Sequence, residues 1–405
     1  MSEIIVLGAG MVGVATALSL QARGHDCVIV DRSPPGRETS YGNAGIIQAE
    51  AVEPYSLPAN PLLLLAMALG RKNAVRVDWL TLPAQVPALL SYWRSSMPGS
   101  LRKIIPVWRG LIEEAIPRHA ALIEAAGAGN LVRENGYWEA YETEAGLAAG
   151  VLAAERRRAI YGLEFTTADR DALQREEPAL KRSLAGAINW SAAWSCADPG
   201  ELVGSYAALF EKRGGRIISG DAASLERSGH RWSVAGETAA AVVVSLGPWS
   251  PQLVSRFGYH VPMVRKRGYH RHYRSDETLS RPMMLSDHSV VMSPMLKGLR
   301  IASAAELSSA APSDDPRQLL RGEAVVRTLL DIGEPVEAKP WSGTRPCLPG
   351  MLPLVCKAPR HEGLWFHFGH GHQGFTLGPV TAERLARAFD GDGSAIKGLD
   401  AALLR

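Results

Sequence analysis

Cysteine is scarce in this sequence, and its four copies form no recognisable pattern. They are Cys27, Cys196, Cys347 and Cys356, with no CxxC pair among the 405 residues. Because disulfide frameworks and cysteine zinc sites depend on such spacing, we expect four reduced thiols. His370 and His372 form an HxH pair, but no cluster of Asp, Glu or Cys completes a ligand set, so no metal is predicted.

Long apolar runs and an excess of one charge are missing too. The longest apolar run, residues 61–69, is too short for a transmembrane helix, which needs about 20 residues. No cationic segment with an apolar stretch follows Met1, so we expect no secretory signal and a cytoplasmic protein. The 44 Lys and Arg against 41 Asp and Glu leave a net charge of +3, too weak a basic field to indicate nucleic acid. The expected partner is therefore a small molecule.

One stretch has the composition of a contact surface. Residues 62–108 combine leucines and three tryptophans with basic side chains, namely Trp79, Trp93, Trp108, Arg71, Lys72, Arg94, Arg102 and Lys103. Such a mixture is compatible with lying against a membrane or another subunit. Packing on its own domain is the alternative. The sequence thus leaves open a peripheral location on the cytoplasmic face of the inner membrane.

The first residues carry the clearest positive signal. An apolar strand over residues 4–7 leads into Gly8, Gly10 and Gly13 in GxGxxG spacing, and a second strand ends at Asp31. The glycines permit a tight turn, close approach to a pyrophosphate and close helix packing, while the acid accepts hydrogen bonds from a ribose. Free N–H groups at the helix start stabilise phosphate charge. The segment predicts a dinucleotide-binding βαβ unit.

Helix and strand patterns alternate along the rest of the chain. Helical periodicity is found in residues 11–23, 108–127, 200–213, 317–332 and 379–390. Strand patterns are found in residues 136–141, 239–246, 261–273 and 289–295. We therefore expect an α/β protein with a discontinuous Rossmann-like domain, residues 1–48, 196–257 and 321–405. An inserted α+β substrate domain with a mostly antiparallel sheet would comprise residues 49–195 and 258–320.

Two polar loops are candidates to complete the nucleotide site. In the first, Thr39 and Ser40 offer hydroxyls to phosphate, and the small residues 43–45 let the backbone approach a flat ring. In the second, residues 369–376 turn from a strand into a helix expected to begin near Pro379. A helix N-terminus can stabilise negative charge on a redox ring. Both loops are equally compatible with ordinary turns.

The motifs together resemble one family. They are GxGxxG at residues 8–13, Asp31, TSxxNAG at 39–45, LGPWS at 246–250, WxGxRP at 341–346 and GHGxxG at 369–374. In this order they resemble the FAD-dependent D-amino acid oxidase superfamily. The TSxxNAG loop and the GHGxxGFT ending are most similar to the small subunit of bacterial D-amino acid dehydrogenase.

That resemblance implies an FAD cofactor held between both ends of the chain. In some relatives a cysteine is tethered to the flavin, but Gly343 occupies that position here, which predicts non-covalent FAD. The residues expected to bind it are Gly8, Gly10, Met11, Val12, Gly13, Asp31, Arg32, Thr39, Ser40, Asn43, Ala44, Gly45, Ala222, Gly247, Trp249, Gly371, Gly374, Phe375 and Thr376.

The resemblance also implies residues for the substrate. It assigns the substrate carboxylate to Arg345, whose planar guanidinium can form paired, charge-assisted hydrogen bonds. A tyrosine at position 269 could hydrogen-bond the same carboxylate, although a place in the core is equally compatible with the sequence. Tyr55, His372 and Gln373 are further candidates for substrate contacts. Relatives often read TPDGLP where residues 348–353 read LPGMLP, so contacts of that acid cannot be transferred.

These assignments predict an enzyme that oxidises a D-amino acid to the imino acid by hydride transfer to flavin N5. Cyclic substrates such as D-proline or hydroxy-D-proline are included. The family likeness favours a dehydrogenase, with a quinone or another electron-transfer component as acceptor, over an oxidase. The alternatives are an enzyme for N-substituted glycines or opines and a flavoprotein subunit active only within a hetero-oligomeric complex. A nicotinamide dehydrogenase, the third alternative, would be colourless.

Overall fold

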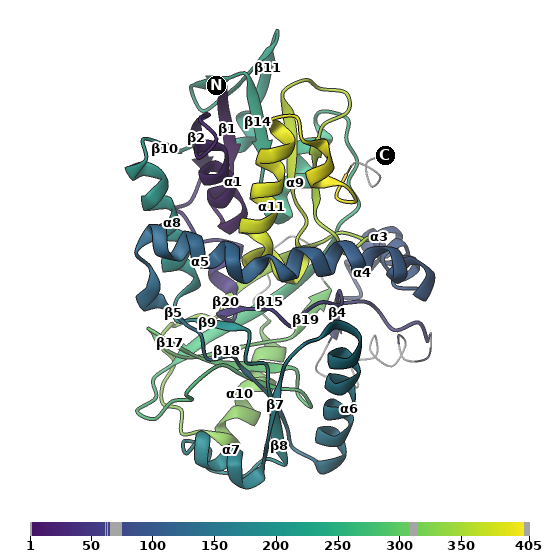
Figure 1. Ribbon diagram of the computed structural model, residues 1–405, viewed down its shortest axis with the longest axis vertical. Helices are drawn as coiled ribbons and strands as arrows, with labels where there is room; N and C mark the ends of the chain where they lie inside the picture. Colours follow the sequence, from purple (N-terminus) through teal and green to yellow (C-terminus); the bar gives the residue numbers. More distant parts are fainter. Residues whose placement is uncertain (1, 61, 63, 65–74, 308–314, 401–405) are drawn as a thin grey trace.

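Both ends of the chain contribute to one mostly parallel sheet in the computed structural model, which describes residues 2–60, 62, 64, 75–307 and 315–400 (Figure 1). In spatial order its strands are β10 (Arg216–Ser219), β2 (Asp26–Asp31), β1 (Glu3–Leu7), β14 (Ala241–Val244), β22 (Leu364–Phe368) and β21 (Leu354–Lys357). Only β21 runs antiparallel to its neighbour. Strand β14 is apolar and fully buried, as a parallel strand covered on both faces must be.

Helices and a small sheet cover the two faces of the parallel sheet. On one face α1 (Met11–Gln21) packs on α8 (Pro199–Lys212) and α11 (Gly374–Phe389), and α5 (Ala115–Ala126) packs on α8 and α11. On the other face lie α9 (Ser250–Ser255) and the antiparallel strands β11 (Glu226–Ser228), β12 (Arg231–Val234) and β13 (Glu237–Ala239). The predicted Rossmann-like fold is confirmed.

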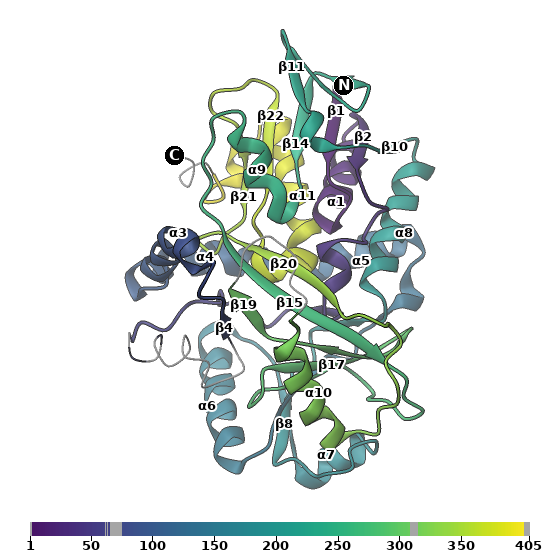
Figure 2. The ribbon, with the colours of Figure 1, turned by 180° about the vertical axis from the view of Figure 1, so that it is seen from behind.

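A second, larger sheet forms the other half of the molecule (Figure 2). In order it contains β4 (Val75–Val77), β19 (Ala305–Leu307), β15 (Val264–Tyr273), β18 (Gly298–Ala302), β17 (Val290–Met295), β16 (Met283–Leu285), β6 (Trp138–Tyr141), β8 (Gly186–Asn189) and β7 (Thr166–Asp169). Strand β20 (Trp341–Cys347) also pairs with β15. Because only β4 with β19 and β6 with β16 are parallel pairs, the predicted mostly antiparallel sheet is confirmed.

Helices surround this second sheet and bridge to the first. Helix α6 (Glu144–Tyr161) packs on β6 and β8, α7 (Arg170–Glu176) packs on β7 and β8, and α10 (Arg317–Leu329) packs on β15 and β18. Helices α3 (Leu82–Ser95) and α4 (Pro98–Glu113) extend sideways between the two halves (Figure 1). A small sheet of β3 (Ile46–Ile47), β9 (Trp194–Cys196) and β5 (Val132–Arg133) lies at the junction. In the part of the chain described, no helix is long and apolar enough to cross a bilayer.

Two helices differ from the sequence pattern. The single helix expected over residues 108–127 is instead α4 and α5, which meet at Glu114. Helix α11 begins at Gly374, before the expected start near Pro379, so the proline lies inside it. Proline cannot donate to the carbonyl four residues earlier. That carbonyl, of Phe375, accepts a hydrogen bond from His119 Nε2 at 3.0 Å instead, which lets the helix start early.

The packing of the elements cuts across the predicted domain limits. Helix α10 and strand β20 fall in the segment 321–405 assigned to the nucleotide half, at least in part, yet both pack on the antiparallel sheet. Conversely, Trp108 and Ile123, assigned to the substrate half, share a core with the parallel sheet. Limits drawn along the chain cannot show such exchanges, because each element packs where its apolar face finds a partner.

Candidate functional site

A cavity of about 380 Å³ opens beyond the carboxyl ends of three parallel strands. Gly8 follows β1, Ser245 follows β14 and Gly369 follows β22, and all three residues line the cavity. Since β2 and β14 lie on opposite sides of β1, this is the point at which the strand order reverses. Ligands bind at such points in open α/β sheets.

The glycine motif forms the floor of the cavity with no space for side chains. Gly8 has a φ of 110°, and a Cβ there would lie 2.5 Å from the Ser245 carbonyl oxygen. A Cβ on Gly13 would lie 1.8 Å from the carbonyl oxygen of Gly8. These contacts explain why β1, β14 and the start of α1 can approach so closely. The backbone is therefore left open toward a ligand, which fits the predicted dinucleotide.

The acid at the end of β2 holds the loop after β1. Asp31 Oδ2 accepts the Ala9 N–H at 2.6 Å, and Oδ1 accepts the Ser33 N–H at 2.9 Å. Each carboxylate oxygen has a second lone pair, so both can still accept a hydroxyl. At the N-terminus of α1, the Met11 N–H donates to Ser40 Oγ at 2.9 Å, which links the two predicted phosphate-binding segments.

An aromatic and a cationic side chain border the outer end of the cavity. The Arg32 guanidinium lies 4.5 Å from the centroid of the Trp249 ring, and its other partner is Glu38, at 3.2 Å. Ala222 and Gly247 line the cavity beside them. Such a stack offers a flat surface to a purine ring. Val12 and Thr39, also predicted, line the cavity nearby.

The loop at residues 39–45 is fixed by hydrogen bonds of its own. Asn43 Oδ1 accepts the N–H groups of Gly45 at 2.7 Å and Ile46 at 3.2 Å, and Ser293 Oγ donates to the Ala44 carbonyl at 2.6 Å. Gly45 has a φ of 71°, and a Cβ there would lie 2.3 Å from the Cys196 carbonyl oxygen. Asn43 lines the cavity, whereas Ala44 and Gly45 lie behind it and shape the turn.

A buried arginine supports this loop from the antiparallel sheet. The Arg300 guanidinium donates to the carbonyls of Tyr41, at 2.9 Å, and Asn43. Its Nε donates to His272 Nε2 at 3.0 Å, so His272 carries its proton on Nδ1 and donates it to Glu337 at 2.6 Å. Burial lowers the pKa of Arg300 to about 10, which leaves it charged at neutral pH. A fixed cation thus lies beneath the loop.

The other glycine loop places the start of α11 at the cavity. Gly371, Gly374 and Phe375 line it, and Thr376 is buried beside it. The Thr376 Oγ1 accepts the Gln48 N–H at 3.4 Å, so residues after the first loop contact the second. Free N–H groups at this N-terminus give the local positive potential predicted for it.

Four polar side chains form a connected group beside the cavity, which one of them, His372, lines. Tyr55 and Gln373 both bond to Gln48 Oε1, at 3.1 and 2.5 Å, and the Tyr55 ring lies 4.9 Å from that of His372. Tyr55 remains 44% exposed, but burial of its hydroxyl end raises the pKa to about 12. Burial also keeps the pKa of His372 well below its usual value, so the imidazole is neutral. The structure therefore brings together three of the candidate substrate residues, Tyr55, His372 and Gln373.

Arg345 reaches the cavity from β20. Its guanidinium lies over Gly268 of β15, where an added Cβ would be 2.7 Å from both terminal nitrogens. It donates a hydrogen bond to the Ala304 carbonyl at 3.4 Å, and within the described residues it has no carboxylate partner. Burial lowers the pKa of Arg345 from a very high ordinary value, so it stays cationic. A guanidinium in this state can hold an incoming carboxylate.

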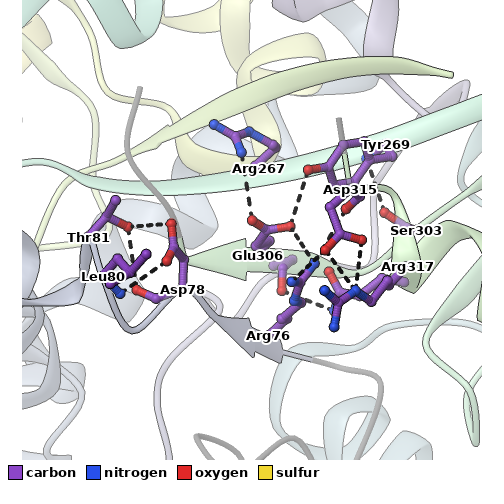
Figure 3. Close-up of polar contacts among 12 residues, drawn as sticks. Arg76, Asp78, Leu80, Thr81, Arg267, Tyr269, Ser303, Glu306, Asp315 and Arg317 are labelled. Carbon is purple, nitrogen blue, oxygen red and sulfur yellow. Dashed lines mark hydrogen bonds and ion pairs between the residues drawn. The ribbon is translucent and has the colours of Figure 1, made fainter. Parts of the chain in front are cut away.

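Tyr269 also lines the cavity, but its hydroxyl points to an ion-pair cluster (Figure 3). It donates to Glu306 at 3.2 Å, and Glu306 contacts Arg267 and Arg76, each at 3.6 Å. Asp315 bonds Arg76 at 2.9 Å and so ties β4 to the segment before α10. A hydroxyl that donates to Glu306 has no second proton for a substrate. Contact of Tyr269 with a carboxylate therefore stays a prediction.

Several residues of the site have no motif that points to them. Gln48, Arg300 and His119 act through contacts with residues far away in sequence. Lys266 lines neither cavity, but it shares a strand face with Gly268, which does, and stands in a basic segment of β15. Trp341 opens a predicted motif, and it lines the cavity in a stack with His270, with ring centroids 4.8 Å apart.

The chain is similar to FAD-dependent enzymes over almost its whole length. The sequence pattern of the DAO family, described as FAD dependent oxidoreductase, matches residues 3–388. A D-amino-acid oxidase of Bradyrhizobium diazoefficiens is 28% identical over 96% of this chain and 95% of its own length. A D-amino acid dehydrogenase of Dechloromonas aromatica is 30% identical over 96% and 97%.

The fold has counterparts among solved structures. Glycine oxidase from Geobacillus kaustophilus superimposes with a TM-score of 0.70 at 20% identity, covering 96% of this chain and 94% of that one. The architecture therefore matches over nearly the full length of both chains. Since the family pattern spans both sheets and both ends of the cavity, this chain belongs to the DAO family of FAD-dependent oxidoreductases.

Proposed function

We propose that this enzyme is a dehydrogenase that oxidises a D-amino acid to the imino acid. The observation that carries the proposal is the Arg345 guanidinium, which faces the cavity with no carboxylate partner among the described residues. When bound, FAD supplies the acceptor, at N5, for the hydride that leaves the substrate α-carbon. The chain's own contribution is to bind, orient and shield the substrate.

The binding of FAD itself is supported along the cavity. The pyrophosphate would lie over Gly8, Gly10 and the start of α1, and a ribose would bond Asp31. Gly343, at the tether position of some relatives, has no space for a side chain, because a Cβ there would lie 2.0 Å from the Trp341 ring. We therefore assign a non-covalent cofactor.

Arg345 would fix the substrate by its carboxylate. A bidentate, charge-assisted contact restrains both position and rotation of the acid group, and so directs the α-hydrogen toward the flavin. Gln48, Gln373 and Tyr55 would border the amine and side chain. No protein base is required if the amine binds neutral, because its lone pair drives departure of the hydride.

Anaerobic mixing of the FAD-loaded protein with single D- and L-amino acids tests this proposal. Loss of flavin absorption with a D-amino acid, and much slower loss with its L-enantiomer, is the expected result. A panel containing sarcosine, D-proline, hydroxy-D-proline and an opine separates the secondary-amine alternatives. If the purified chain is inactive alone but active in a co-purified complex, the hetero-oligomeric alternative holds instead.

The electron acceptor belongs to the same proposal. A quinone or another electron-transfer component is favoured by a surface that fits a membrane. On the turn before α3 and on α3, Trp79 is 57%, Leu80 93% and Leu90 49% exposed. Arg94, Arg102 and Lys103 are exposed on α3 and α4. Trp108, by contrast, is buried, and Arg71 and Lys72 lie outside the described residues.

A further inference from the structure

Two cationic side chains stand opposite each other beside the cavity. The register of β15 and β20 pairs Lys266 with Arg345, so both side chains leave the same face of the sheet. Directly opposed like charges destabilise a sheet. Neither side chain has an Asp or Glu partner among the described residues. The pair therefore has a cost in stability that an anion at this place would offset.

The buried ammonium of Lys266 has few hydrogen-bond acceptors among the described residues. It is 8% exposed, its Nζ lies 3.4 Å from the Tyr92 hydroxyl, and it lies 4.5 Å from the centroid of the same ring. The hydroxyl of Tyr92 in turn donates to the Tyr55 carbonyl at 2.5 Å. An ammonium has three N–H donors, and burying it without acceptors is unfavourable. Burial and the neighbouring Arg345 both lower the pKa of Lys266.

The ammonium contacts Tyr92, which borders a small extension of the cavity with a volume of about 10 Å³. Tyr92, Cys347 and Tyr55 border this extension, and residues 369–372 line both it and the main cavity. The charges of Lys266 and Arg345 both act on His372, at the boundary between the two spaces. A ligand that starts at Arg345 and extends past His372 therefore approaches Lys266.

We propose that Lys266 binds a second anionic group of the substrate, so that the enzyme prefers amino acids with two carboxylates. This inference rests on the proposed function, in which Arg345 holds the α-carboxylate. Lys266 is then a specificity-determining residue. The competing arrangement, in which Lys266 and Arg345 share one carboxylate, predicts no preference for a second acid.

Matched substrates test this in the FAD-loaded enzyme. D-glutamate and D-glutamine have the same length and differ in one charge. Iminodiacetate and sarcosine form a second pair, which differs in one carboxylate group. In at least one pair, the wild-type enzyme should oxidise the diacid with a kcat/KM at least about tenfold higher than that for its partner with one carboxylate. A charge-assisted hydrogen bond contributes a free energy of that size. In Lys266→Met the preference should fall to within about threefold, while the rate with the neutral partner changes little.

The variant should fold, because a buried charge replaced by an apolar side chain of similar volume is often tolerated. Lys357→Met, at an exposed lysine on β21, is the matched control and should keep the preference. As a readout independent of turnover, glutarate should raise the melting temperature of the holoenzyme more than valerate does. Lys266→Met should abolish that difference.

Equal rates with both members of each pair in the wild type would overturn the inference. So would an equal loss for both members in Lys266→Met, which is the signature of one shared carboxylate. If no amino acid reduces the flavin, the proposed function fails. The comparison of glutarate with valerate then still decides whether Lys266 binds a second acid, so the two failures are distinguishable.

Discussion

Gly13 is the residue of the glycine motif at which an added methyl group has the largest predicted effect on FAD binding. A Cβ there would lie 1.8 Å from the Gly8 carbonyl oxygen, a backbone atom that cannot turn away. Gly13→Ala should therefore push α1 from β1 and weaken FAD binding by at least about tenfold, through misplaced N–H groups. Fluorescence titration of the apoprotein with FAD measures this.

Gly204 offers a matched control. It lies within α8, has no positive φ, and an added Cβ meets nothing within 4 Å. Gly204→Ala should leave FAD affinity unchanged and raise stability by roughly 0.5–1 kcal/mol, because alanine is the better helix former. Equal FAD affinity in both variants would contradict the assigned role of Gly13.

At the scale of residues, the sequence could predict those whose role follows from a local spacing. The glycine motif, Asp31 and Arg345 are recognisable because strand, turn and helix come in a fixed order around them. Gln48 and Arg300 were missed, because their partners are about 250–330 positions away in the chain. No local pattern encodes such contacts.

At the scale of elements, the start of α11 depends on α5. His119 of α5 donates to the Phe375 carbonyl, which Pro379 leaves without its helical partner. Burial lowers the pKa of His119 to about 4, below an unfolded value of about 6.5. The stability that the neutral imidazole contributes is thus complete above pH 6.5, and up to about 3 kcal/mol is lost as the pH falls toward 4.

Urea unfolding at pH 7.5 and pH 5 measures this effect. His119→Gln keeps a donor for Phe375 but does not titrate. Between the two pH values the wild type should therefore lose about 2 kcal/mol more of its free energy of unfolding than this variant does. His119→Leu should lose about 1–3 kcal/mol already at pH 7.5, because the carbonyl is left unpaired. An identical pH dependence in wild type and His119→Gln would show that another group titrates.

The loop at residues 39–45 makes a second element-scale prediction. Arg300→Met removes the donor to two of its carbonyls and to His272. The loop should then lose its fixed shape, and the FAD dissociation constant should rise by at least about tenfold. Arg281→Met, at an arginine before β16 whose ion-pair partner is Glu176, should leave the constant unchanged. Unaltered FAD binding in Arg300→Met would refute the supporting role.

Elements with an unbroken period were predictable, and those decided by distant partners were not. The helices α1, α8 and α10 and the strand β14 agree with the pattern to within a few residues. The break at Glu114 comes just before Pro117, in the first turn of α5, which cannot donate to the carbonyl of Glu113. The early start of α11 follows from the contact with His119 of α5. Helix propensity depends only on residues that are neighbours in the chain. It therefore predicts a helix start at Pro379, although His119 of another helix supplies the hydrogen bond that this proline cannot donate.

At the scale of the whole molecule, the exposed apolar side chains of the α3 region predict membrane contact. The holoenzyme should sediment with vesicles containing phosphatidylglycerol and much less with phosphatidylcholine alone, because Arg94, Arg102 and Lys103 are exposed on α3 and α4. Leu80→Ser should weaken vesicle binding by about tenfold. Leu152→Ser, at a leucine 73% exposed on α6, is the control. Wild-type protein that stays in the supernatant would contradict this prediction.

The two halves of the molecule meet at one cavity, and this explains why its walls come from the N-terminal, middle and C-terminal segments of the chain. Gly8 and Asp31 come from the first strands, Trp249 from the middle, and Arg345 and Gly371 from the C-terminal segment. The fold class and the family could be predicted from motifs at both ends. The exact exchange of elements between the halves could not, because it depends on the shapes that meet there.

The central claim is that Arg345 presents an amino acid to FAD bound in this cavity. Its most direct test is the anaerobic reduction of bound flavin by a D-amino acid in the wild type and in Arg345→Met. The account predicts that both proteins bind FAD and that the variant loses at least about 100-fold in kcat/KM. Arg345→Lys should recover only part of this, because lysine lacks the bidentate fork. Full activity in Arg345→Met, or a wild-type protein that takes up no flavin on reconstitution, would contradict the account.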